Sequence, residues 1–166
     1  VAFLFAGTIG LNRSFMLEKE NGCLQGLLLA PMDRTALYFG KLVSNFVFLL
    51  IMEVFTLPLF MVFFNIDLLP HLLPLLYVIF VGTLGFCAVG TLLSSLSANL
   101  KTRDIMLPIL LYPLIIPIII GSVRMTGQVL AGEPLSSMMN WVSLTLCFDI
   151  IYIAISIMVI DFVLEE

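Results

Sequence analysis

Residues 72–97 read LLPLLYVIFVGTLGFCAVGTLLSSLS and contain no charged side chain. At about 1.5 Å per residue, a helix over this run is long enough to cross the hydrocarbon core of a bilayer, which is about 30 Å thick. Further apolar runs lie outward from it at about 42–64, 105–123 and 141–161, and the tail of another covers residues 1–11. The sequence therefore predicts an all-α, polytopic membrane helix bundle with four complete spans and one truncated span.

The composition agrees with this class. The chain has 166 residues, of which 61% are hydrophobic and 11% charged, and its mean hydropathy is +1.20. The spans leave little length for a soluble domain, so we expect a single transmembrane domain over residues 1–166. One further span upstream would give six spans in the full protein.

Several functional classes are excluded by the residues present. The net charge of −4 provides no basic surface for nucleic acid. The three cysteines lack CxxC spacing and there is one histidine, so neither a metal site nor a catalytic residue is indicated. The chain contains no GxxxxGK[ST] loop, so it cannot hydrolyse ATP by itself.

The basic residues predict the orientation of the bundle, because basic residues near span ends are retained in the cytoplasm. Predicted loop 65–71 has none, and predicted loop 124–140 has only Arg124. The other six lie in predicted loops 12–41 and 98–104: Arg13, Lys19, Arg34, Lys41, Lys101 and Arg103. We therefore expect loops 12–41 and 98–104 to be cytoplasmic.

Loop 12–41 is longer than a simple connection between two spans requires. Four of its residues share one face of a short helix that Pro31 would end: Cys23, Leu24, Leu27 and Leu28. Asp33 is placed to cap a second helix, which runs through Tyr38 into the span that begins near Lys41. The short helix could lie on lipid headgroups or form a docking surface for a cytoplasmic partner.

Two stretches resemble a known family. Residues 17–31, LEKENGCLQGLLLAP, followed by Gly40-Lys41-Leu42, resemble the first cytoplasmic loop of type-2 ABC exporter permeases. In these permeases an acidic pair and a glycine precede a short coupling helix, a proline, and a Gly-Lys at the next span. Residues 107–117, LPILLYPLIIP, resemble the proline-spaced penultimate span of the CcmB family, the membrane subunit of the haem exporter of cytochrome c maturation.

The resemblance implies a permease subunit of an ABC-type haem exporter complex in the bacterial inner membrane. Its implied partners are a CcmA-like cytoplasmic ATPase, which binds the ATP, further haem-handling membrane subunits, and a haem chaperone. No cofactor is expected on this chain, and haem is the handled ligand. ATP hydrolysis would drive haem export or release the haem-loaded chaperone; the alternative is a type-2 permease for a lipid, a polysaccharide or a drug.

The resemblance also implies which residues couple the ATPase to the spans. These are the acidic pair, the turn glycine, the apolar face of the short helix, the proline and the lysine at the next span. They are Glu18, Glu20, Gly22, Leu24, Leu27, Leu28, Pro31 and Lys41.

Two carboxylates are predicted inside the membrane. Glu53 lies near the middle of the span at 42–64 and Asp149 near the middle of the span at 141–161, with no Lys or Arg at similar depth. An unpaired charge there costs at least about 2.5 kcal/mol. Either a transport role or a role as a polar contact between helices fits.

The span at 105–123 contains three prolines, Pro108, Pro113 and Pro117. Each removes a backbone donor and bends a helix. The bend could act as a hinge, or it could be a static kink packed against its neighbours. Small residues at Gly82, Gly90, Ser94 and Ala98 predict close helix packing, either within the chain or between two copies.

Overall fold

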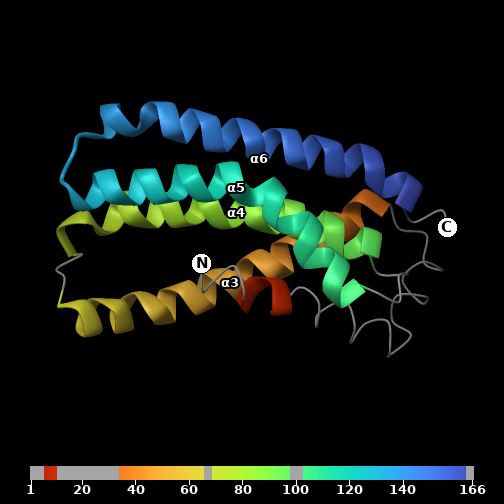
Figure 1. Ribbon diagram of the computed structural model, residues 1–166, viewed down its shortest axis with the longest axis horizontal. Coiled ribbons are helices and arrows are strands. Elements are labelled where there is room, and N and C mark those ends of the chain that lie inside the picture. Colours follow the sequence, from red (N-terminus) through yellow and green to blue (C-terminus); the bar gives the residue numbers. More distant parts are fainter. Residues whose placement is uncertain (1–5, 11–33, 66–68, 98–102, 164–166) are drawn as a thin grey trace.

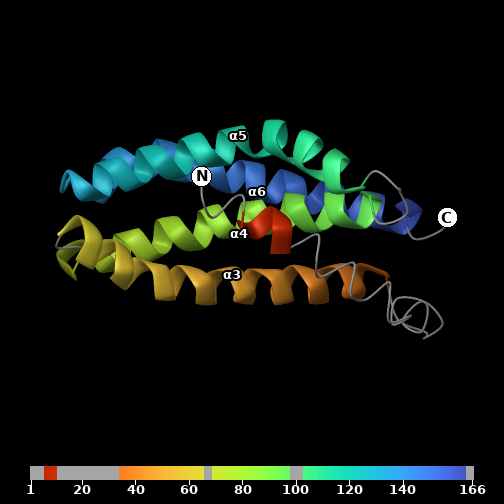
Figure 2. The same ribbon diagram turned by 60° about the horizontal axis from the view of Figure 1, so that its bottom comes forward.

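The computed structural model describes residues 6–10, 34–65, 69–97 and 103–163. Residues 6–10 are helical. The main elements are α3 (Arg34–Phe64), the short 3₁₀ helix η1 (Leu69–His71), α4 (Leu72–Ser97), α5 (Arg103–Leu130) and α6 (Leu135–Val163). The described part of the chain is thus an all-α bundle (Figures 1 and 2).

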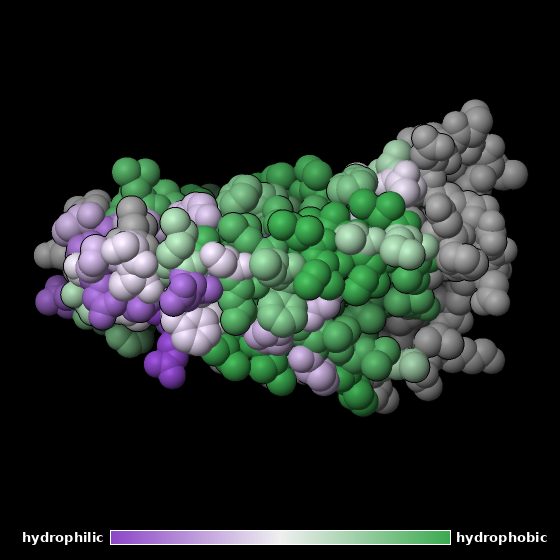
Figure 3. All heavy atoms as spheres, turned by 90° about the horizontal axis from the view of Figure 1, so that it is seen from above, coloured by the Kyte–Doolittle hydropathy of each residue, from purple (hydrophilic) through white to green (hydrophobic). Residues whose placement is uncertain are grey.

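Four helices are long and apolar enough to cross a membrane: Thr35–Phe64, Leu72–Leu96, Met106–Leu130 and Ser136–Val159. They confirm the four complete spans expected from the sequence. Figure 3 shows an apolar surface over the middle of the bundle, with polar side chains gathered at one end. The truncated span predicted at 1–11 lies partly outside the described residues and stays a prediction.

Neighbouring helices alternate in direction. The beginnings of α3 and α5 and the ends of α4 and α6 lie at the same end of the bundle, on the right in Figure 1. The opposite end holds η1 and the turn between α5 and α6. Arg34 and Lys41 near the beginning of α3 and Arg103 at the beginning of α5 therefore lie at one common end, as the predicted topology requires.

Helix α4 lies at the centre of the bundle and packs against α3, α5 and α6. Half of the residues in its most apolar stretch are buried, whereas only 6% of those in the corresponding stretch of α3 are buried. The exposed α3 surface is apolar and includes Val43, Val62 and Phe63. Helix α3 is therefore the least enclosed helix of the four.

The prediction of an external loop at residues 124–140 is wrong. Helix α5 continues to Leu130 and α6 begins at Leu135, which leaves only residues 131–134 between them. Polar residues such as Arg124 and Asn140 interrupt the apolar runs without ending the helices. Instead of lying in a loop, the Arg124 guanidinium lies 6.0 Å from the centre of the Trp141 ring on α6.

A glycine ends α5. Gly132 has a φ of +72°, a conformation that residues with a Cβ rarely adopt. The Gly132 N–H donates to the Val129 carbonyl at 3.1 Å, and the Glu133 N–H donates to the Gln128 carbonyl at 3.1 Å. This pair of bonds is the Schellman arrangement, which satisfies carbonyls that the end of a helix leaves free.

Glycines bring α4, α5 and α6 close together. A Cβ placed on Gly82 of α4 would lie 2.6 Å from the Ser122 Oγ of α5. A Cβ on Gly121 of α5 would overlap the Thr145 hydroxyl of α6. Close approach at small residues is a main source of helix association in membranes, where lipid removes most of the hydrophobic driving force. The small residue Gly82 thus serves packing within one chain.

We expect Gly121→Ala to lower the free energy of unfolding by about 1–3 kcal/mol, because the added methyl group displaces Thr145 and separates α5 from α6. The matched control is Gly127→Ala in the same helix, where a Cβ meets no atom within 4 Å. This control should be neutral or stabilising by up to about 1 kcal/mol, because alanine favours helix formation. Unfolding of the purified protein in mixed detergent micelles measures both, and equal effects would contradict the packing role of Gly121.

Candidate functional site

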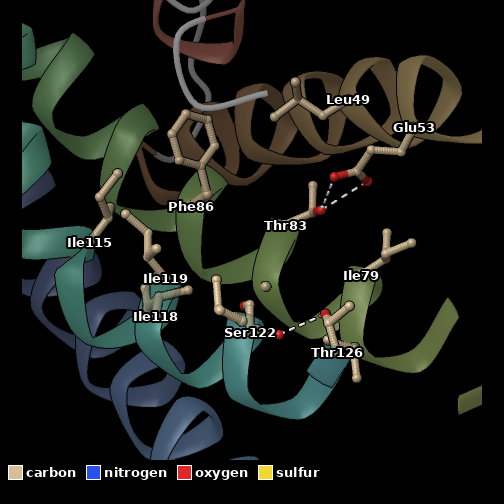
Figure 4. Close-up of a pocket in the computed structure, with 13 residues that line it drawn as sticks. Leu49, Glu53, Ile79, Thr83, Phe86, Ile115, Ile118, Ile119, Ser122 and Thr126 are labelled. Atoms are coloured by element: carbon tan, nitrogen blue, oxygen red, sulfur yellow. Dashed lines mark hydrogen bonds between the residues drawn. The ribbon is translucent and has the colours of Figure 1, made fainter. Parts of the chain in front are cut away.

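Glu53 of α3 contacts the middle of the bundle through a threonine. The Thr83 hydroxyl on α4 lies 2.8 Å from Glu53 Oε1 and 2.9 Å from Oε2, so it donates a hydrogen bond shared between the two oxygens. Figure 4 shows both side chains pointing toward each other from α3 and α4. The sequence predicts the intramembrane position of Glu53 but not Thr83 as its partner.

Two cavities meet at Glu53. One, of about 190 Å³, lies between α3, α4 and α5 and is lined in part by Glu53, Thr83 and Ser122. The other, of about 290 Å³, also includes Glu53 and extends to Phe60 and Leu130. No Lys, Arg or His is among the described residues that line either cavity. The cavities are therefore apolar spaces with one acidic group.

Asp149 lies on the other side of α4. Its side chain is 1% exposed and contacts α4 at Gly85, where a Cβ would overlap its Oδ1. Both carboxyl oxygens are buried and neither has a hydrogen-bond partner among the described residues. Gly85 is therefore required to make room for Asp149, and nothing in the apolar run at 72–97 marked this glycine as different from its neighbours.

The two carboxylates approach the same level of α4 from different directions. Thr83 and Gly85 are two residues apart, and in a helix of about 3.6 residues per turn such positions point to nearly opposite sides. Glu53 approaches from α3 and Asp149 from α6. The structure does not bring them together, so they do not form a paired acid–base site.

The three prolines lie inside α5, which stays helical through Pro108, Pro113 and Pro117. Figure 1 shows that α5 changes direction along the half that contains them. The Tyr152 hydroxyl of α6 donates a 2.7 Å hydrogen bond to the Leu114 carbonyl, in the turn that precedes Pro117. A neighbouring helix thus provides a donor to the bent region; whether the bend acts as a hinge stays a prediction.

Most of the predicted coupling residues lie outside the described residues: Glu18, Glu20, Gly22, Leu24, Leu27, Leu28 and Pro31. Lys41 lies within α3, near its beginning. Helix α3 begins at Arg34, which confirms that a helix runs through Tyr38 into the span. The predicted coupling segment is therefore followed immediately by a transmembrane helix.

Comparison with known proteins identifies the family. The family model described as "CcmB protein" matches residues 1–165. A protein of Rhodobacter capsulatus named "Heme exporter protein B" is 31% identical over 117 residues, which are 70% of this chain and 53% of that protein. The chain thus spans about half the length of this curated relative, and no solved structure matches it.

The match extends over nearly the whole chain, including the four membrane-length helices and the proline-containing α5. The chain is a multi-pass membrane protein and belongs to the CcmB family.

Proposed function

We propose that this chain is the permease subunit of an ABC-type haem exporter complex that acts in c-type cytochrome biogenesis in the bacterial inner membrane. The observation that carries the proposal is the family match over residues 1–165. The name of the relative, "Heme exporter protein B", supports haem over a lipid, a polysaccharide or a drug as the handled molecule. The energy would come from a separate CcmA-like ATPase, and a haem chaperone and further membrane subunits would complete the complex.

Helix α3 is the element we propose to transmit movement from the ATPase. It follows the predicted coupling segment directly and is the least buried of the four spans. Side-chain hydrogen bonds between described residues join it to α4. They link Tyr38 to the Ala88 carbonyl at 3.1 Å, Asn45 to Thr91 at 3.2 Å, and Glu53 to Thr83 at 2.8 Å.

The other three spans form the part against which α3 would move. Glycines at positions 82, 85 and 121 let polar side chains of neighbouring helices approach the α4 and α5 backbones closely. Such close contacts resist separation because the dispersion attraction between the packed atoms would be lost. We infer that displacement of the coupling segment shifts α3 along or away from the α4–α6 unit.

Within this part of the chain, a mechanical role is better supported than a haem conduit. The cavities of about 190 and 290 Å³ have no Lys, Arg or His among the described residues that line them, so no described side chain there would pair with the propionates of haem. They also present the Glu53 carboxylate, which would repel the propionates of haem. We therefore favour release of a haem-loaded chaperone, driven by movement of the spans, over passage of haem through these cavities.

The coupling segment is tested with Glu18→Ala, Glu20→Ala and a scrambled 23–30 sequence in the full-length protein. We expect each to weaken co-purification with the ATPase or to lower its ATP turnover, since the segment is proposed to contact that subunit. The matched control is Glu133→Ala, which removes an exposed glutamate at the opposite end of the bundle. Association and turnover equal to wild type in all three variants would contradict the proposal.

The carboxylates are expected to differ in function. Glu53→Gln should lower the yield of c-type cytochrome by up to about tenfold. This corresponds to a change of about 1.4 kcal/mol in the free-energy difference between the two positions of α3. Asp149→Asn should retain near wild-type yield, because no described group bonds to the Asp149 oxygens and asparagine has nearly the same shape. The yield is measured by haem staining at equal membrane levels, and full yield with Glu53→Gln would show that Glu53 has only a packing role.

A further inference from the structure

The two cavities beside Glu53 form a route from the middle of the bundle to one of its ends. They share Glu53, Ile79 and Thr126. The larger cavity extends to Phe60 and to Leu130, the last residue of α5, at the end that holds the α5–α6 turn. An elongated apolar molecule could therefore place one end at Glu53 and its body between α3, α4 and α5.

Among the described residues that line the cavities, three of the four hydroxyls donate within the protein, whereas the buried Ser122 hydroxyl has no hydrogen-bond partner. The Thr56 hydroxyl donates to the Met52 carbonyl at 2.8 Å, and the Thr126 hydroxyl donates to the Ser122 carbonyl at 2.7 Å. The Thr83 hydroxyl donates to Glu53. These three hydroxyls are therefore not free to donate to a ligand.

Glu53 differs from these hydroxyls because, among the described residues that line the cavities, it is the one that can carry a charge. An ionised carboxylate can accept about four hydrogen bonds, and Thr83 supplies a single donor. No cationic side chain is among the described residues that line the cavities. A carboxylate in such an apolar site is stabilised by a group that brings both positive charge and N–H donors.

We propose that the cavities bind a primary ammonium group carried on an apolar chain, with the ammonium on Glu53. Apart from Glu53, Gly82 and the four hydroxyl side chains, the lining is aliphatic or aromatic and suits a single hydrocarbon chain. It includes Leu57, Leu75 and Phe86. An anionic group would meet the Glu53 carboxylate and be repelled. The same chemistry is available from a free long-chain amine and from the headgroup of an aminophospholipid.

The test uses the full-length protein in phosphatidylcholine nanodiscs and a dodecylamine probe that carries a photoreactive diazirine in its chain. Labelled peptides are located by mass spectrometry. Unlabelled dodecylamine, 1-dodecanol and dodecanoate then compete with the probe, and a separate set of nanodiscs contains phosphatidylethanolamine. We expect labelling within α3, α4 and α5 around the cavities, with dodecylamine competing at least about tenfold better than dodecanol or dodecanoate.

Competition by phosphatidylethanolamine identifies a lipid headgroup as a source of the ammonium group, whereas competition by dodecylamine alone identifies a free amine. Both outcomes support the site. Equal competition by the alcohol or the carboxylate would overturn it, because the chain alone would then explain binding.

Two variants test the role of the carboxylate. Glu53→Gln should reduce labelling at least about tenfold, because the amide carries no charge. Asp149→Asn makes the same chemical change on the other side of α4 and should leave labelling unchanged. Unchanged labelling with Glu53→Gln would overturn the proposal. If that variant fails to fold, the test is the competition on the wild-type protein between the cationic dodecylamine, the neutral dodecanol and the anionic dodecanoate.

This site can fail independently of the proposed haem-export role. If labelling is not specific for the amine while the cytochrome yield is normal, the ammonium site is contradicted and the proposed function is not. Specific labelling by a protein that neither binds the ATPase nor supports cytochrome formation would retain the site and contradict the proposed function.

Discussion

The close approach of α4, α5 and α6 determines how the rest of the bundle is arranged. In a bilayer, helices gain little by burying apolar surface from one another, so they associate where small residues permit close contact and where polar groups meet. Gly82 accommodates Ser122, Gly85 accommodates Asp149, and Gly121 accommodates Thr145. Every one of these contacts crosses between two of the same three helices. We therefore propose the α4–α6 unit as the part that stays fixed; α4 lies at its centre.

Helix α3 is attached in a different way. Its contacts with α4 include hydrogen bonds from Tyr38, Asn45 and Glu53, while most of its apolar surface stays exposed. Hydrogen bonds between membrane helices contribute roughly 0.6–2 kcal/mol each, so a few of them hold a helix without fixing it permanently. Such a helix, joined directly to a segment that we propose to bind an ATPase, is suited to move while α4–α6 stays together.

Hydropathy predicted the number of complete spans and the intramembrane positions of Glu53 and Asp149, because a long apolar run with an isolated charge can be recognised from the sequence alone. It misplaced the α5–α6 connection, since Arg124 and Asn140 looked like loop residues although both remain helical. The actual end of α5 depends on the backbone conformation of Gly132. Thr83 and Gly85 could not be predicted as the contacts of the two carboxylates, because this depends on how three helices are rotated against one another.

The central claim is that α3 moves relative to a fixed α4–α6 unit when ATP binds to the partner ATPase. Spin labels at Val43 and Leu96 report on α3 against α4, and labels at Leu96 and Met158 report on α4 against α6; all three positions are exposed. With the native cysteines replaced, electron paramagnetic resonance measures both distances in the assembled complex with and without ATP. The account predicts a shifted distance distribution for Val43–Leu96 and an unchanged one for Leu96–Met158. An unchanged Val43–Leu96 distance, or equal shifts in both pairs, would contradict it.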